Sequence, residues 1–310
     1  MGRRVSVRRV LDHGPDGRSR FGDVVGDLVS LGAQTAVVDT RHGLIEVPLE
    51  SVSIARLVPP STADELALET VAAQGLRPAE TEELGGWLLR ADHGFTRRAN
   101  SVLPLRQPGR PLDEALALAH AWYAERGLPL RLQVPVEGRR LLDAELGERG
   151  WAATARTHLF VARLDALSAP SAGAGPPVEI ADRPDADWLS LYRDGGGQSE
   201  TGRALLSRHD RLAFATARVE GRPVAVARGA VDDGWLGVMA VEVEPDHRRR
   251  GLAGAVMAAL WRWAATTHGA THSYLSVLVD NTSAVALYDR LGYWVHHDYH
   301  YRDEPAAEAP

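Results

Sequence analysis

The stretch V-E-P-D-H-R-R-R-G-L-A-G-A-V-M, residues 243–257, decides the fold that the sequence predicts. Residues 238–243 form an alternating apolar pattern that predicts a strand, and the apolar residues that follow the stretch predict a helix. The first N–H groups of a helix lack intrahelical acceptors and carry partial positive charge. Gly251, Ala253 and Gly254 have almost no side chain, so phosphates can approach the backbone closely. The stretch therefore predicts a strand, an anion-binding loop and a helix.

The spacing of the loop excludes two other phosphate-binding motifs. A dinucleotide loop requires G-x-G-x-x-G, and a nucleoside-triphosphate loop requires G-x-x-x-x-G-K-[ST], whereas this chain contains no lysine. The run from Arg248 to Arg250, taken alone, is better explained as a solvated turn than as an anion site. The position of the arginine relative to Gly251 and Ala253 carries more information than the charge does.

The pattern Arg248-x-x-Gly251-x-Ala253 resembles the R/Q-x-x-G-x-G/A acyl-coenzyme-A loop of the GNAT acyltransferase superfamily. The downstream sequence extends the resemblance, because the family pattern N-x-x-A-x-x-x-Y-x-x-x-G-[FY] is matched at every position by Asn281, Ala284, Tyr288, Gly292 and Tyr293. Asn281, Ala284 and Tyr288 are spaced three and four apart, which places them on one face of a helix. The resemblance implies acetyl-coenzyme A as co-substrate and coenzyme contacts at Val241, Val243, Arg248, Arg249, Arg250, Gly251, Ala253, Gly254, Asn281, Ala284 and Tyr288.

Amine acylation by a thioester needs an acid, a base and an oxyanion site, and a positioned acid or base contributes about 10²- to 10⁴-fold. The resemblance implies that Tyr288 protonates the departing thiolate. It also implies that the backbone N–H of Val243 holds the oxyanion, at the place where the family's fourth strand bulges. For the base we favour Glu242, with Glu244, water and a histidine as alternatives.

A metal site is the weaker interpretation of the last predicted strand. His296, Asp298 and His300 alternate along residues 294–302 and therefore share one face. Such residues can hold a metal, but polar residues on an edge strand account for the pattern equally well. We expect no metal.

Composition limits the class of protein. The chain of 310 residues is 45% hydrophobic and 25% charged, with a formal net charge of −6. This composition predicts a globular protein of two or three domains, and the negative charge argues against a nucleic-acid partner. No apolar run reaches the roughly 18 residues that a membrane span requires, so we expect a cytoplasmic protein without a membrane partner. The absence of cysteine excludes disulfides and a cysteine nucleophile.

Residues 1–59 predict a small β-barrel. Short strands are expected at residues 4–11, 23–30, 35–39, 44–48 and 52–58, with turn signals between them. This segment resembles the Src-homology-type barrels that precede acetyltransferase domains in some actinobacterial proteins. Its arginine-rich first twenty residues leave nucleic-acid binding as a weak alternative.

Residues 60–165 predict a second, degenerate copy of residues 178–303. Arg106, Gly109, Gly127, Gly150 and Trp151 precede Arg248, Gly251, Gly269, Gly292 and Tyr293 by 142 positions each, for example 248 − 106 = 142. Pro108 and Pro111 lack the N–H groups that phosphates need, and Leu146 stands at the place of Tyr288. We therefore expect no coenzyme in this copy. Residues 166–177 predict a linker, residues 304–310 a tail, and residues 194–200 a glycine-rich loop that lines the acceptor site.

The sequence thus predicts an α/β protein with two GNAT-like domains, each a central mixed sheet flanked by helices. Its expected activity is transfer of an acetyl or other acyl group to an amine of a small molecule or peptide, by direct attack in a ternary complex. The alternative is a catalytically silent, coenzyme-A-binding regulatory or adaptor protein, and thioester hydrolysis is a minor third option. A homodimer is compatible with the sequence.

Overall fold

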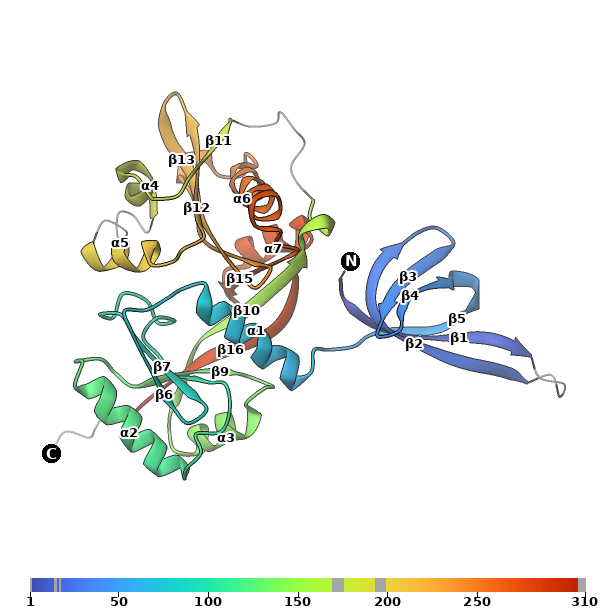
Figure 1. Ribbon diagram of the computed structural model, residues 1–310, viewed down its shortest axis with the longest axis horizontal. Helices are drawn as coiled ribbons and strands as arrows, with labels where there is room; N and C mark the ends of the chain where they lie inside the picture. Colours follow the sequence, from blue (N-terminus) through green and yellow to red (C-terminus); the bar gives the residue numbers. More distant parts are fainter. Residues whose placement is uncertain (1, 14–15, 17, 169–175, 193–198, 306–310) are drawn as a thin grey trace.

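The computed structural model describes residues 2–13, 16, 18–168, 176–192 and 199–305 and places an N-terminal sheet beside a larger body (Figure 1). Most of the predicted glycine-rich loop, of the linker and of the tail lies outside the described residues. No helix in the described ranges is long and apolar enough to cross a membrane.

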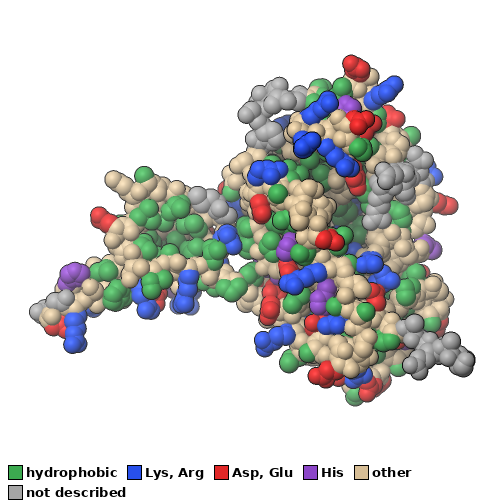
Figure 2. Space-filling model, turned by 180° about the vertical axis from the view of Figure 1, so that it is seen from behind, with side chains coloured by type: hydrophobic (Ala, Val, Ile, Leu, Met, Phe, Trp, Pro, Cys, Tyr) green, Lys and Arg blue, Asp and Glu red, His purple; other side chains and the backbone are tan. Residues whose placement is uncertain are grey.

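The N-terminal sheet contains five antiparallel strands in the order β4-β3-β2-β1-β5. Their bounds are β1 Arg4–His13, β2 Ser19–Leu31, β3 Thr35–Thr40, β4 Gly43–Pro48 and β5 Val52–Leu57. Alternate side chains point inward, so a small valine core forms from Val5, Val7, Val24, Val38 and Val47. The five predicted strands are confirmed, and the sheet is consistent with a small barrel-like domain. Several large hydrophobic side chains stay exposed on it, including Leu11, Phe21, Leu31, Leu44 and Ile54. Figure 2 shows that hydrophobic side chains cover much of one face of this N-terminal part.

The body is built on an eight-stranded mixed sheet with the order β11-β12-β13-β14-β15-β10-β16-β9. The bounds are β9 Arg131–Pro135, β10 Ala152–Arg163, β11 Val178–Ala181, β12 Leu212–Val219, β13 Arg222–Asp232, β14 Trp235–Val243, β15 His272–Leu278 and β16 Trp294–Asp303. A separate three-stranded sheet contains β6 Glu80–Leu84, β7 Trp87–Ala91 and β8 Leu103–Pro104. These sheets and their flanking helices confirm the predicted α/β class.

Helices cover both faces of the large sheet (Figure 1). Alternate residues of β10 show the division, because Phe160 and Ala162 pack with α6 (Leu252–His268) and α7 (Thr282–Leu291), whereas Leu159 and Val161 pack with α1 (Thr62–Gln74). Helices α4 (Ala186–Leu191) and α5 (Glu200–Ser207) pack on β12 and β13. The body has two halves, residues 60–165 and residues 178–303. In the first half, α2 (Leu112–Ala124) and α3 (Arg140–Glu148) cover β9 and its neighbours.

The two halves of the body exchange strands, which the sequence did not predict. Strand β10 belongs to the first half but lies between β15 and β16 of the second half, and β16 in turn pairs with β9 of the first half. Each half therefore supplies the strand that completes the other half's sheet.

Candidate functional site

The centre of the candidate site is a gap between β14 and β15. These two parallel strands pair over a short stretch that begins with Trp235 opposite His272 and ends with Val238 opposite Leu275. The described residues of β14 after Val238 have no register partner in β15. The side chains of β14 change from buried to half-buried after Val238. A ligand can therefore reach the backbone of the second half of β14.

A β-bulge opens this gap, and its position differs from the prediction. The β13–β14 register shifts between Val226 and Arg228, whose partners are Glu242 and Met239. Ala240 lies in this interval and has φ +55°, a left-handed conformation that inserts the extra residue. The sequence analysis placed the bulge at Val243, which is wrong, because Val243 is in register with Ala225. No glycine marks the bulge, so the sequence gives no local sign of it.

The N–H of Val243 nevertheless points into the gap. Glu244 donates its N–H to the carbonyl of Val224 at 2.9 Å on the β13 side. Consecutive residues of a strand direct their N–H groups to opposite edges, so the N–H of Val243 faces the β15 side. This arrangement leaves a backbone donor available in the gap.

The predicted anion loop lies where β14 leads into α6. A short 3₁₀ helix, Pro245–His247, precedes it, and both Arg249 (φ +60°) and Gly251 (φ +79°) are left-handed. Helix α6 begins without a side-chain cap, so the N–H groups of its first turn lack intrahelical acceptors. The Nε of Arg248 donates to the carbonyl of Val243 at 3.3 Å, which folds this arginine back along the strand end. The loop therefore presents backbone donors and exposed guanidinium groups together.

Tyr288 lies on α7 and is buried beside the gap. Its ring centroid is 6.0 Å from that of Phe160 and 6.1 Å from that of Tyr293. Burial, and after it the negative charge of Glu242, raises the pKa of Tyr288 to about 12. The phenol is therefore protonated at neutral pH, and the charge of Glu242, the favoured base, contributes to holding the proton on it.

Two other predicted residues have structural roles. Asn281 caps α7, since its Oδ1 accepts the N–H of Ala284 at 3.2 Å and the hydroxyl of Ser283 at 3.1 Å. Glu244 lies 2.8 Å from Nδ1 of His247. The cap fixes the start of α7 and thereby the face that carries Ala284 and Tyr288.

The three candidate metal ligands on β16 do not converge. His296 contacts His297 at 2.9 Å, Asp298 contacts His158 at 2.6 Å, and His300 contacts Asp143 at 2.5 Å. Within the described part of the chain, no group of three or more His, Cys, Asp or Glu residues is arranged to hold a metal ion.

Sequence reasoning missed the contribution of β10. Phe160 is fully buried against Tyr288, and Ala162 lies in the same core, although both belong to the half expected to be silent. Their apolar character was visible, but the pairing of β10 with β15 depends on contacts distant in sequence. The candidate acid therefore packs against a side chain from the other half.

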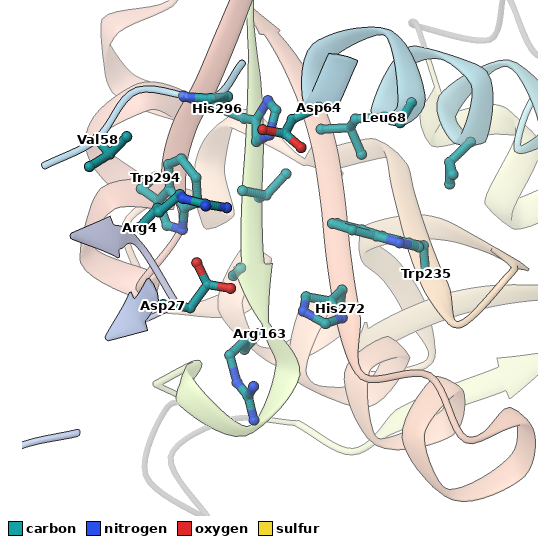
Figure 3. Close-up of a pocket in the computed structure, with 16 residues that line it drawn as sticks. Arg4, Asp27, Val58, Asp64, Leu68, Arg163, Trp235, His272, Trp294 and His296 are labelled. Atoms are coloured by element: carbon teal, nitrogen blue, oxygen red, sulfur yellow. The ribbon is translucent and has the colours of Figure 1, made fainter. Parts of the chain in front are cut away.

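A separate cavity of about 320 Å³ lies where the N-terminal sheet meets the body (Figure 3). Trp235, His272 and Trp294 line it together with Arg4 and Asp27 of the N-terminal sheet. Trp235 is eight residues from Val243, or about 26 Å along an extended strand. This junction cavity is therefore at the end of β14 opposite the candidate site.

Three comparisons bear on the chain. Residues 62–302 match the family model described as "Probable histone acetyltransferase Rv0428c C-terminal". The Probable histone acetyltransferase Rv0428c of Mycobacterium tuberculosis is 33% identical over an alignment of 325 positions, gaps included, that covers 97% of this chain and 94% of the relative.

Two solved structures share the fold. A GCN5-related N-acetyltransferase from Kribbella flavida has a TM-score of 0.63 at 22% identity and covers 78% of this chain and 96% of its own. A tandem GNAT protein from the clavulanic acid biosynthesis pathway has a TM-score of 0.54 at 13% identity and covers 81% and 99%, respectively. At these identities the two structures support the fold alone.

Proposed function

The chain belongs to the GNAT N-acetyltransferases, in the family of the C-terminal region of probable histone acetyltransferase Rv0428c, and from this premise we propose that it transfers an acetyl group from acetyl-coenzyme A to an amine. The observation that carries the proposal is the gap between β14 and β15, which ends at the uncapped start of α6 and has Tyr288 beside it. We assign the reaction to residues 178–303, the silent copy to residues 60–165 and the barrel-like domain to residues 1–59.

The residues at the gap fit acetyl-coenzyme A. The uncapped N–H groups of α6 and the exposed Arg248, Arg249 and Arg250 suit its phosphates, and the N–H of Val243 suits an amide-bearing arm or the oxyanion. When bound, acetyl-coenzyme A supplies the acetyl group and a thiolate leaving group. We propose coenzyme contacts at the residues that the motif implies, from Val241 to Gly254 and at Asn281, Ala284 and Tyr288.

The chain's own residues then handle two protons. Glu242, directly or through water, accepts a proton from the acceptor ammonium, which frees the nitrogen lone pair to form the new C–N bond. Water takes the second proton that the nitrogen loses as the amide forms. The N–H of Val243 stabilises the negative charge on the carbonyl oxygen. As the C–S bond breaks, Tyr288 gives its proton to the sulfur, which its raised pKa permits at neutral pH. The products are the acylated amine and the free thiol.

We propose a cationic amine as acceptor. The mycobacterial relative is named a probable histone acetyltransferase, and a lysine of a basic protein is a cationic amine. The formal net charge of −6 favours attraction of such a substrate. A small polyamine has the same chemistry and is the second acceptor class to screen.

Acetyl transfer by the full chain tests the proposal. Purified protein with acetyl-coenzyme A and either a histone-derived lysine peptide or spermidine should release coenzyme A in step with acceptor acetylation, detected by a thiol reagent and by mass spectrometry. The Tyr288→Phe variant should bind acetyl-coenzyme A but turn it over slowly. Binding without turnover on a broad amine panel would favour the silent adaptor alternative, and release of thiol without acetylated amine would indicate hydrolysis.

A further inference from the structure

A second cavity, of about 460 Å³, lies in residues 60–165 where α2 and α3 begin. Its lining includes Arg106, Arg110, Arg139 and Arg140. Adding 142 to Arg106 and to Arg139 gives Arg248 and Asn281, so this arginine cavity is the counterpart of the coenzyme site in the other half. We infer that the arginine cavity binds a pyrophosphate-bearing anion that lacks the coenzyme's pantetheine arm.

The arginine cavity carries an excess of positive charge. Four arginines and two glutamates, Glu137 and Glu145, line it, which gives a balance of +2. Arg110 is paired with Glu114 at 3.1 Å, and Glu145 is paired with Arg149 at 2.9 Å. Arg106 and Arg140 are exposed, and neither has an ion pair with any residue that the structure describes. Two guanidinium groups are therefore available for an anion.

Arg139 is a third cation whose charge the described residues do not balance. It is half-buried, and its hydrogen bonds run to backbone carbonyls: Nε donates to Pro104 at 2.5 Å, Nη1 donates to Gly138 at 3.1 Å, and Nη2 donates to Leu105. No carboxylate among the described residues forms an ion pair with it, and burial lowers its pKa. A neighbouring anion would favour the charged form of this group.

The same hydrogen bonds exclude the pantetheine arm. Pro104 and Leu105 are at the end of β8, which occupies the place that β14 has in the other half. The guanidinium of Arg139 fills this end of the strand, whereas the corresponding backbone in the second half opens into the gap beside β15. The arginine cavity thus retains the outer, phosphate-sized part of a coenzyme site and has its inner part closed by a side chain.

Side chains replace backbone donors in this cavity. Pro108 and Pro111 remove two N–H groups from the loop, so the loop resembles the anion loop at Gly251 only in position. Arginine forms paired, charge-assisted hydrogen bonds with phosphate oxygens, and three guanidinium groups without ion pairs surround the space. A cavity of 460 Å³ is within the usual range of small-ligand sites. Pyrophosphate, free or as part of a nucleoside diphosphate, has the charge and size that this lining suits.

The test uses the full chain and inorganic pyrophosphate, titrated by calorimetry at low salt with saturating acetyl-coenzyme A present to block the Gly251 loop. We expect one pyrophosphate site per chain. Arg106→Gln with Arg140→Gln should weaken it by at least about tenfold, as expected for loss of charged hydrogen bonds. The control pair Arg41→Gln with Arg222→Gln removes two exposed arginines elsewhere and should leave it unchanged.

Several outcomes would overturn the inference. Pyrophosphate binding that acetyl-coenzyme A abolishes would belong to the Gly251 loop, and equal loss in the control pair would indicate a general charge effect. Unchanged binding by the Arg106/Arg140 variant would exclude the cavity. If acetyl-coenzyme A itself fails to bind to the full chain, the proposed function fails. The arginine cavity can still be tested independently, by titrating pyrophosphate into the Gly251→Pro variant, in which the Gly251 loop is disrupted. In the Gly251→Pro background, ADP should bind with an affinity similar to that of pyrophosphate. Coenzyme A should not bind at the arginine cavity in this background. If coenzyme A does bind, and the binding depends on Arg106 and Arg140, the result would contradict the closure of the inner part of the cavity by Arg139.

Discussion

Thr157 of β10 and Tyr299 of β16 are register partners where the two halves of the body meet in the large sheet, and they are also equivalent positions of the two halves, since 299 − 157 = 142. An approximate two-fold axis therefore passes between them. The order β15-β10-β16-β9 follows this symmetry, because each half contributes one exchanged strand. The exchange makes the two halves depend on each other for a complete sheet.

Separating the halves should abolish folding. Residues 178–303 alone lack β10, so the edge of β15 is unpaired and the core beside Tyr288 loses Phe160 and Ala162. We expect residues 178–303 expressed alone to be insoluble or to show no cooperative unfolding by circular dichroism, and co-expression with residues 2–168 to restore a soluble complex. A cooperative transition of the isolated half at the temperature of the full chain would contradict this interdependence.

Phe160→Ala should destabilise the protein strongly. The side chain is fully buried between the sheet and Tyr288, and truncation of such a residue costs about 3 to 5 kcal/mol. Urea unfolding of the variant measures this loss. Phe160→Leu is the matched control, because it keeps most of the volume and should lose much less; equal losses would indicate that burial at this position is not the cause.

Tyr288→Phe should lower kcat by about 10²- to 10⁴-fold, because a positioned acid is removed. Acetyl-coenzyme A binding should be little changed, since the ring that packs on Phe160 is retained. Tyr293→Phe is the control: its hydroxyl bonds Ser273 and Trp261 in the core, so this variant should lose stability and keep its kcat. A Tyr288→Phe enzyme with normal kcat would remove Tyr288 from the acid role.

Acidification should destabilise the protein between about pH 6.5 and pH 4. Burial, followed by the charge of His297, lowers the pKa of His296 to about 4, from the ordinary histidine value of about 6.5. The unfolded chain then binds more protons than the folded chain in this window, so stability rises with pH across it and is lost as pH falls. The free energy of unfolding lost across the whole window is roughly 3 kcal/mol. Urea unfolding measures the free energy of unfolding at pH 4.5 and at pH 7. The difference between the two values should be smaller for His296→Gln than for the natural chain. An equal difference in the two proteins would contradict this account of His296.

The sequence predicted elements better than it predicted their partners. The N-terminal strands follow from local alternation and turn residues, and all of them except β2 agree with the structure to within two residues at each end. The placement of β10 between β15 and β16 depends on pairing between residues more than a hundred positions apart, which no local pattern encodes. The bulge at Ala240 was misplaced by three residues because alanine rarely has positive φ and gives no signal in the sequence.

The site was predictable to the extent that its motif is local. Tyr288 and Glu242 were named from spacing and resemblance, and the charge of Glu242 contributes to the raised pKa of Tyr288. Phe160 could not be assigned to the site, because it comes from the half that the sequence analysis expected to be silent, although its ring packs against Tyr288. Asn281 was assigned to the coenzyme, and its helix-capping role follows from the same position at the start of α7.

Calorimetric titration of acetyl-coenzyme A tests the central claim most directly, when it compares the full chain with Gly251→Pro and with its counterpart Gly109→Pro. Both glycines are left-handed, at φ +79° and +74°, and an added Cβ would meet nothing within 4 Å at either position. Proline cannot adopt this φ at either site, so the two substitutions strain the chain similarly in the two halves. We expect one site per chain, lost in Gly251→Pro and retained in Gly109→Pro. Binding that survives Gly251→Pro, or that Gly109→Pro abolishes instead, would contradict the assignment of the coenzyme to residues 178–303.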